Sequence, residues 1–501
     1  MREQLTRLAR GAAIYGIGGV LSRVISLLLL PLFTAYLAPV DYGVIAMLGL
    51  LGFLLVPVFT LGLGTSMGLS YFELSGGGDR KSATIWTAFT ILLASSIVMV
   101  LIGTLFSGEI SVLLFRSDAY AGLVVLSILA TAAGILSLPF TLALQLEERA
   151  ALFVTLSTVS SLASILLTFL MVVVLRAGVR GYVLAGLWSQ VLIFLAFLAP
   201  SAVRKIRWDG KVARDLLRHG YPMIPAFAGI FVLQQGNRYI LEHFRGLGEL
   251  GLYTVGHNIG FAMTLLVNAF SGAWSPYFLS FTGREEEARE LFGRIGTYYV
   301  FGLGAVSLLF YMFAKPVVLI LTKPLFHASW SVVGLTASAC FFNGAFSLFL
   351  PPVYFAKEVR SITMVQIVAA IVSIGLALLL IPPFGIVGAG ITLAGGALAM
   401  AALMQAWNAW NRGRYLAVAY EWGRIRRFAA AYVVLAVAYS LRRELSVPAE
   451  IALSAAGAAV LLGVVYSLLR ETERKALTGW FVRREGPGAA PLDAEDHDNR
   501  K

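Results

Sequence analysis

Two arginines lie inside long apolar segments of this chain, where a charge is costly and therefore informative. Arg23 lies about 16 Å into a bilayer core of roughly 30 Å if the first apolar segment is a helix that begins after Gly11. A guanidinium near the midplane costs about 2.5–3.5 kcal/mol, so we expect it to face water or an anion. Its planar fork donates two hydrogen bonds, which suits phosphate. The alternative is that Arg23 bonds to buried helix carbonyls.

A second polar cluster lies near the outer end of the seventh apolar segment. It consists of Gln234, Gln235, Asn237 and Arg238. We expect Gln234, Asn237 and Arg238 to contact a substrate on the same route as Arg23. The alternative for Arg238 is that its long side chain simply extends to the membrane surface.

His257 is predicted to lie about two turns into the eighth segment, where it can face the same cavity. The alternative is a buried histidine satisfied by one hydrogen bond. Further amides inside apolar segments are interpreted as helix-to-helix hydrogen bonds; they are Asn268, Asn343, Gln366 and Gln405.

The residues offer no catalytic or cofactor chemistry. The five histidines are not paired at metal-ligand spacing, and Cys340 is the single cysteine, so no metal site is expected. The run 76–82 ends in Lys81-Ser82 but has Arg80 where a nucleotide-binding loop requires glycine. We therefore expect neither an enzyme nor a cofactor.

The elements that must position these side chains are long apolar helices. Only 13% of the residues are charged and 58% are hydrophobic, against about 25% charged in an average soluble domain. Uncharged runs long enough to cross a bilayer recur along the chain; examples are 42–72, 82–108, 119–146, 150–175, 181–203, 250–283, 295–314, 324–356 and 361–411. Since Pro382-Pro383-Phe384-Gly385 divides the last run, the pattern predicts an all-α polytopic membrane protein of fourteen transmembrane helices.

The first twelve predicted helices form two halves with matching landmarks. Asp41-Tyr42-Gly43-Val44 corresponds to Glu249-Leu250-Gly251-Leu252, and Gly178-x-x-Gly181 corresponds to Gly385-x-x-Gly388. Because each half contains an even number of spans, the halves should be related by a parallel pseudo-twofold axis along the membrane normal. Asp41 and Glu249 each open a helix, where a carboxylate suits the cap.

This repeat predicts the following organisation. It comprises an N-lobe at 1–203, a basic cytoplasmic linker at 204–219, a C-lobe at 220–411, a basic loop with two more helices at 412–470, and a disordered cytoplasmic tail at 471–501. Gly64 with Gly68, and Gly256 with Gly260, have the spacing of helix-packing contacts.

The net charge of +12 follows membrane topology rather than nucleic-acid binding. Basic residues gather in the loops 201–219 and 412–427, on one side of the predicted membrane. Such a bias orients helices during insertion, so both termini are predicted to be cytoplasmic. The basic start before residue 12 precedes an apolar run too long for a signal peptide, and we expect that span to be retained.

Several motifs resemble the Wzx-like polysaccharide-biosynthesis flippases, a branch of the multidrug/oligosaccharidyl-lipid/polysaccharide exporter superfamily. The motifs are 18–23 (GGVLSR), 31–37 (PLFTAYL), 41–43 (DYG), 237–241 (NRYIL), 250–255 (LGLYTV) and 273–278 (AWSPYF). The resemblance implies two six-helix lobes around a central cavity. Members often have an acid at the position of Asn237, where this chain has an amide, so a role of that acid does not carry over to it. The chain resembles peptidoglycan-precursor flippases more weakly.

The resemblance implies a bacterial inner-membrane flippase that moves an undecaprenyl-diphosphate-linked oligosaccharide from the cytoplasmic to the outer leaflet by alternating access. Its partners would be the lipid-linked oligosaccharide, membrane lipids and possible glycan polymerases or glycosyltransferases. Two rivals are a cation-coupled multidrug exporter, which requires an acidic cavity, and a peptidoglycan lipid-precursor flippase. A third is a scaffold for glycan assembly.

If Arg23 binds the diphosphate, Arg23→Ala will abolish complementation of a flippase deletion without lowering protein abundance. Arg23→Lys will restore it only in part, because an ammonium lacks the bidentate fork. Growth and polysaccharide production measure complementation, and immunoblotting measures abundance. Full activity of the alanine variant would remove Arg23 from the mechanism.

Overall fold

The computed structural model describes residues 25, 29–73, 78–201, 205–442 and 446–474, and every regular element within them is helical. The main helices are α2 (Leu30–Tyr36), α3 (Pro39–Phe59), α4 (Leu63–Glu73), α5 (Gly78–Leu105), α6 (Ser107–Phe115), α7 (Ala121–Leu146), α8 (Ala150–Phe169), α9 (Gly178–Leu198), α10 (Gly210–Gly220), α11 (Ile224–Gly260), α12 (Thr264–Leu279), α13 (Glu285–Leu321), α14 (Trp330–Leu348), α15 (Pro351–Phe355), α16 (Arg360–Trp410), α17 (Trp422–Ser440) and α18 (Val447–Leu468). The all-α prediction is confirmed. Arg23 and most of the first predicted span lie outside the described residues.

Ten helical stretches of the described chain are long and apolar enough to cross a membrane, so the chain is a multi-pass membrane protein. Two of the ten are interrupted. Gly246 has φ 82° inside Leu233–Leu279, and Gly385 has φ 53° inside Arg360–Trp410. These are left-handed conformations that favour glycine, and the second lies where Pro382-Pro383 predicts a division. The count of fourteen stays a prediction, because α17 is not among the ten and the first span is largely undescribed.

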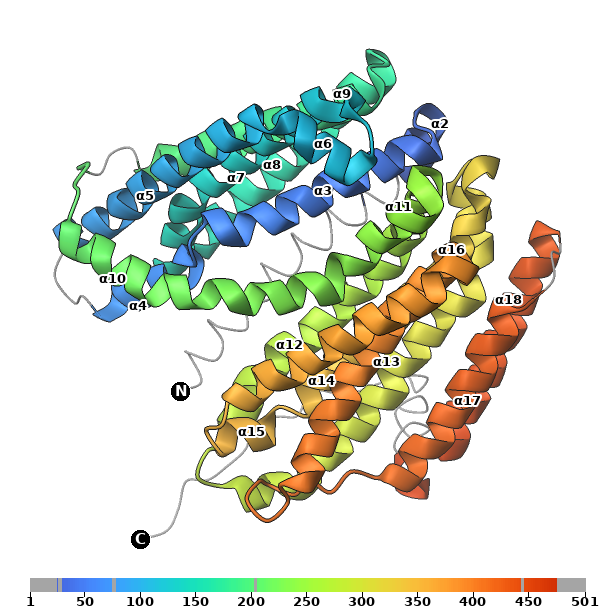
Figure 1. The fold of residues 1–501 in the computed structure, drawn as a ribbon. Coiled ribbons are helices and arrows are strands. Elements are labelled where there is room, and N and C mark those ends of the chain that lie inside the picture. The colour runs from blue at the N-terminus through green and yellow to red at the C-terminus, as the bar shows by residue number, and fades with distance from the viewer. Residues whose placement is uncertain (1–24, 26–28, 74–77, 202–204, 443–445, 475–501) are drawn as a thin grey trace, which may run out of the picture.

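The helices form two groups (Figure 1). We call α3 to α10 the first bundle and α12 to α18 the second bundle. α11 lies between them and packs against α3 on one side and against α14 and α16 on the other. The predicted lobe boundaries and the parallel pseudo-twofold axis stay predictions. The arrangement places α11, which is divided at Gly246, where both groups contact it.

The bundles meet where the repeated motifs begin. A methyl group at Gly43 of α3 would collide with the carbonyl oxygen of Leu247, and one at Gly251 of α11 would collide with the carbonyl oxygen of Pro39. Asp41 caps α3 by accepting a 2.7 Å hydrogen bond from the Ala38 amide, as predicted. The corresponding glycines of the two halves therefore allow the helix backbones to touch.

A second predicted glycine pair also brings helices together. A Cβ at Gly256 or Gly260 would collide with α14 or the turn before it, at the carbonyl oxygens of Ser329 and Val333, so the predicted packing role is confirmed. Outside the glycines' own stretch of α4, no described atom lies within 4 Å of a Cβ built at Gly64 or Gly68, so the described chain provides no packing contact for that pair.

Because a side chain at Gly251 overlaps the backbone of α3, Gly251→Val should destabilise the protein by roughly 1–3 kcal/mol. Gly248→Ala is the matched control, since its Cβ would lie 4.0 Å from Val40, an ordinary contact. Thermal unfolding of the detergent-solubilised protein measures both. Equal melting temperatures for the valine variant and the native protein would show that this contact does not hold the bundles together.

The C-terminal helices α17 and α18 are anchored to α13 by a buried ion cluster at one end. Lys315 Nζ lies 2.8 Å and Arg442 Nε 3.3 Å from carboxylate oxygens of Glu450, and all three side chains are at most 5% exposed. Both cations also lie over the ring of Trp330, at 5.6 and 5.7 Å. Two cations around one buried carboxylate leave no unpaired anion inside the apolar bundle.

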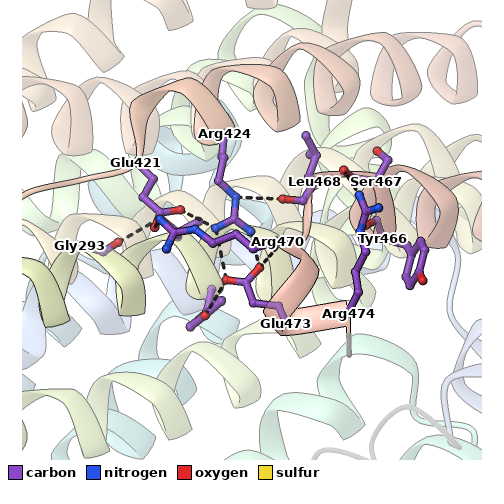
Figure 2. Close-up of polar contacts among 11 residues, drawn as sticks. Gly293, Glu421, Arg424, Tyr466, Ser467, Leu468, Arg470, Glu473 and Arg474 are labelled. Atoms are coloured by element: carbon purple, nitrogen blue, oxygen red, sulfur yellow. Dashed lines mark hydrogen bonds and ion pairs between the residues drawn. The ribbon is translucent and has the colours of Figure 1, made fainter. Parts of the chain in front are cut away.

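The other end of the helix pair carries a second cluster (Figure 2). Arg424 contacts Glu421 at 2.5 Å and Glu473 at 2.6 Å, while Arg470 contacts Glu421 at 2.6 Å. The Tyr298 hydroxyl of α13 donates to Glu473 at 2.8 Å. Burial raises the pKa of Glu473, but the hydrogen bonds from Arg424, the Arg470 amide and Tyr298 outweigh it and lower that pKa to about 2.

The depressed pKa of Glu473 predicts acid-sensitive stability. The contribution is fully present above the carboxyl's ordinary pKa of 4.5 and is lost as the pH falls from 4.5 toward 2. Glu473→Gln should therefore lower thermal stability at neutral pH, by at most about 3 kcal/mol, and flatten its dependence on pH in that window. Exposed Glu471→Gln is the control with the same charge change. Identical pH profiles for both variants would contradict this assignment.

Candidate functional site

A polar cavity of about 560 Å³ lies between α11 and helices α12, α14 and α16 of the second bundle, and Phe53 at the middle of α3 borders it from the first bundle. Its amide, imidazole and guanidinium side chains are Gln234, Gln235, Arg238, His257, Asn258, Asn268 and Asn343. An adjoining cavity of about 210 Å³ shares Gln234 and Asn343 and adds Gln366. Three of the five predicted substrate-contacting residues, Gln234, Arg238 and His257, thus line one space.

Arg238 faces the cavity because it lies one helical turn beyond Gln234 on the same side of α11. It is half-buried, and its Nε is buried without a hydrogen-bond partner. Within the described chain, no carboxylate lies within ion-pair distance of this guanidinium. The structure therefore places an uncompensated positive charge at a polar cavity inside the membrane-spanning region.

His257 of α11 lies in a stack of aromatic rings from this helix and the turn that follows it. Its ring is nearly parallel to that of Tyr253, at 5.7 Å between centroids, and to that of Phe261, at 5.3 Å. The side chain is only 9% exposed, yet it lines the cavity beside Asn258. The ring stack fixes the orientation of the imidazole at the cavity wall.

Asn237 does not line the cavity, although its neighbour does. Its Nδ2 donates to the Tyr253 hydroxyl at 2.7 Å and to the Ala389 carbonyl at 3.3 Å. Adjacent helix positions point about 100° apart, so Asn237 faces α16 while Arg238 faces the cavity. Asn237 joins the two halves of α11 to α16 and so positions the wall that carries Arg238.

The interpretation of the other buried amides as helix-to-helix hydrogen bonds differs from the structure. Asn268, Asn343, Gln366 and Gln405 make no hydrogen bond to any other described residue, and each lines a cavity instead. Asn268 and Asn343 are exposed to the main cavity. The sequence does contain a signal for a polar cavity, because these amides lie inside apolar helices of the predicted C-lobe. The sequence does not show which side of its helix each amide faces.

The first bundle holds a different cavity, of about 460 Å³, between α3, α7 and α9. Its described lining is mostly apolar or small, and its polar side chains include Tyr182, Gln190, Thr60 and Thr131. No charged residue occurs in that lining as far as the structure describes it. Among the described residues, the charge of the candidate route therefore rests on Arg238 of α11; Arg23, the other arginine expected there, lies outside the described residues.

Comparison with known proteins agrees with this architecture. The model of the family described as polysaccharide biosynthesis protein matches residues 8–282, more than half of the chain. No curated protein matches the sequence.

Two solved structures share the fold. The lipid II flippase MurJ in its inward closed conformation has a TM-score of 0.68 at 12% identity, and the match covers 92% of this chain and 98% of that one. An inward-facing multidrug resistance transporter of the MATE family, in the MOP superfamily, has a TM-score of 0.64 at 14% identity, with 79% and 98% covered. Together with the family match, these likenesses are those of a transporter and not of an enzyme, as predicted. The chain belongs to the polysaccharide biosynthesis protein family and has the fold that these two transporters share.

Proposed function

We propose that this protein is a flippase that moves an undecaprenyl-diphosphate-linked oligosaccharide from the cytoplasmic to the outer leaflet of the bacterial inner membrane. The observation that carries the proposal is Arg238, a guanidinium without an ionic partner in the described chain, at a polar cavity of about 560 Å³. Family membership supports a saccharide cargo.

The chemistry of the cavity suits this cargo. A buried guanidinium within a membrane is stable when it contacts water or an anion, and a diphosphate offers several acceptor oxygens. The amides of Gln234, Asn268 and Asn343 each present both a donor and an acceptor, which is what sugar hydroxyls require. The phosphates would bind Arg23 and Arg238 in turn, while the lipid tail stays in the bilayer.

Alternating access would operate at the contact between α3 and α11. The backbones touch at Gly43 and Gly251, so separating the bundles there would break a close-packed interface rather than stretch it. Such an interface has two discrete states, closed and open. With both termini in the cytoplasm, this contact closes the route on the outer side.

A cation-coupled multidrug exporter on the same fold is the rival function. That activity needs carboxylates in the cavity, whereas the described lining contains Arg238 and His257 and no Asp or Glu. A peptidoglycan lipid-precursor flippase is a closer alternative, because its cargo is also a lipid diphosphate. The lipid species that accumulates after gene deletion separates these three functions.

Arg238→Gln should lower flipping by about tenfold or more, the cost of losing a charge-assisted hydrogen bond to phosphate. The flipping rate of Arg238→Lys should fall between those of Arg238→Gln and the native protein. The measurement is the amount of lipid-linked oligosaccharide left on the cytoplasmic side of a complemented deletion strain, normalised to protein abundance.

The control is Arg180→Gln, which removes an equal charge from an exposed position at the start of α9. It should flip at the native rate. If Arg238→Gln also flips at the native rate, the guanidinium has no role in transport and the proposal loses its main support.

A further inference from the structure

A separate cavity of about 290 Å³ lies at the end of the second bundle where α13 begins and α16 ends. One wall is the segment 416–420, whose Ala419 amide donates to the Arg289 carbonyl at 3.1 Å. The opposite wall carries Gln405, Asn408 and Arg412. The basic loop that contains Arg412 places this end on the predicted cytoplasmic side.

The cavity is positively charged and uncompensated. Arg289 and Arg412 both line it, neither makes an ion pair with a described residue, and no carboxylate occurs in its described lining. Two acids at this end of the bundle are already paired: Glu358, in the turn before α16, contacts Arg414 at 2.5 Å, and Glu421 contacts Arg424. Two free guanidinium groups at one cavity favour a phosphate.

The cavity also presents an acceptor that lacks a donor. Asn408 is 7% exposed, and its Nδ2 donates to the Phe349 carbonyl at 2.7 Å, which identifies the other amide atom as oxygen. That Oδ1 is buried and has no partner in the described chain, and the same holds for Gln405 Oε1. A buried acceptor is costly unless a donor reaches it, so a ligand that carries hydrogen-bond donors such as hydroxyl groups beside its phosphate fits this lining.

The aromatic residues around the cavity place it at the membrane interface. Tyr420 and Trp422 line it, and Trp410 at the end of α16 is 89% exposed. Tryptophan and tyrosine concentrate at the level of lipid headgroups, and basic pockets between helices on the cytoplasmic side bind anionic headgroups.

We propose that this cavity binds a phosphate ester with free hydroxyls, namely the phosphoglycerol headgroup of an anionic phospholipid. The phosphate contacts Arg289 and Arg412, and the glycerol hydroxyls donate to Asn408 and Gln405. The bound lipid is not the transported cargo, since the cavity is distinct from the one that contains Arg238.

The test uses the full-length protein, freed of lipid in a neutral detergent, with lipid binding measured by native mass spectrometry and by thermal stabilisation. The probes are phosphatidylglycerol, phosphatidic acid, phosphatidylethanolamine and soluble glycerol phosphate. Phosphatidylglycerol should bind most tightly, and Arg289→Gln or Arg412→Gln should weaken it about tenfold. Arg426→Gln, an equal charge change at an exposed position outside the cavity, should have no effect.

Asn408→Leu should reduce phosphatidylglycerol binding to the level of phosphatidic acid, which lacks the glycerol hydroxyls. If that variant does not fold, Gln405→Leu tests the same recognition, because its side chain makes no hydrogen bond within the described chain. The proposal would be overturned if the native protein bound phosphatidylglycerol and phosphatidic acid equally. It would also be overturned if Arg426→Gln weakened phosphatidylglycerol binding as much as Arg289→Gln or Arg412→Gln. Glycerol phosphate binding as tightly as the lipid would overturn the assignment to a headgroup. None of these measurements depends on flipping.

Discussion

The contact between α3 and α11 at Gly43 and Gly251 is the constraint on which the rest of the architecture depends. Lipid tails are as apolar as leucine, so helices in a bilayer associate through close packing rather than through the hydrophobic effect. Because Gly43 and Gly251 have no side chain, the carbonyl oxygens of Leu247 and Pro39 can approach the opposing backbone closely. Because α11 also packs against α14 and α16, the position of this contact sets where the second bundle lies and therefore how wide its polar cavity is.

The Glu450 cluster and Arg238 are two sets of charges away from bulk water, and their partners distinguish them. Glu450 is enclosed by Lys315 and Arg442, and this cluster fastens the C-terminal helix pair to α13. Arg238 has no such partner at its cavity. Burying a charge is tolerated when a counter-charge or water compensates it. A compensated cluster is therefore architectural, whereas the uncompensated arginine is suited to an anion that arrives and leaves.

Much of the fold follows from local rules, and the site follows from them only in part. Long uncharged runs predict membrane helices because a charge inside a bilayer is costly. Gly385 after two prolines predicts the break in the last long run, and the structure has a left-handed residue there. The direction in which each amide points from its helix was not predictable. A helix of a soluble protein reveals its buried side by a polar stripe on the opposite face, and these apolar segments have no such stripe. Asn268 and Asn343 were consequently interpreted as packing residues, yet they line the cavity.

The amino-acid order alone determined the membrane class and the placement of Arg238 within a span, because both depend on composition or on counting along a helix. The repeated halves and the side of the basic loops stay predictions of the same kind. Tertiary structure decided which neighbours share a surface. It directs Arg238 to the cavity and Asn237 to Tyr253, and it gathers Arg289 and Asn408, which are distant in sequence, around one opening. The reason is rotational: spacing along a helix determines depth, but only the packing of neighbouring helices determines which side faces a cavity.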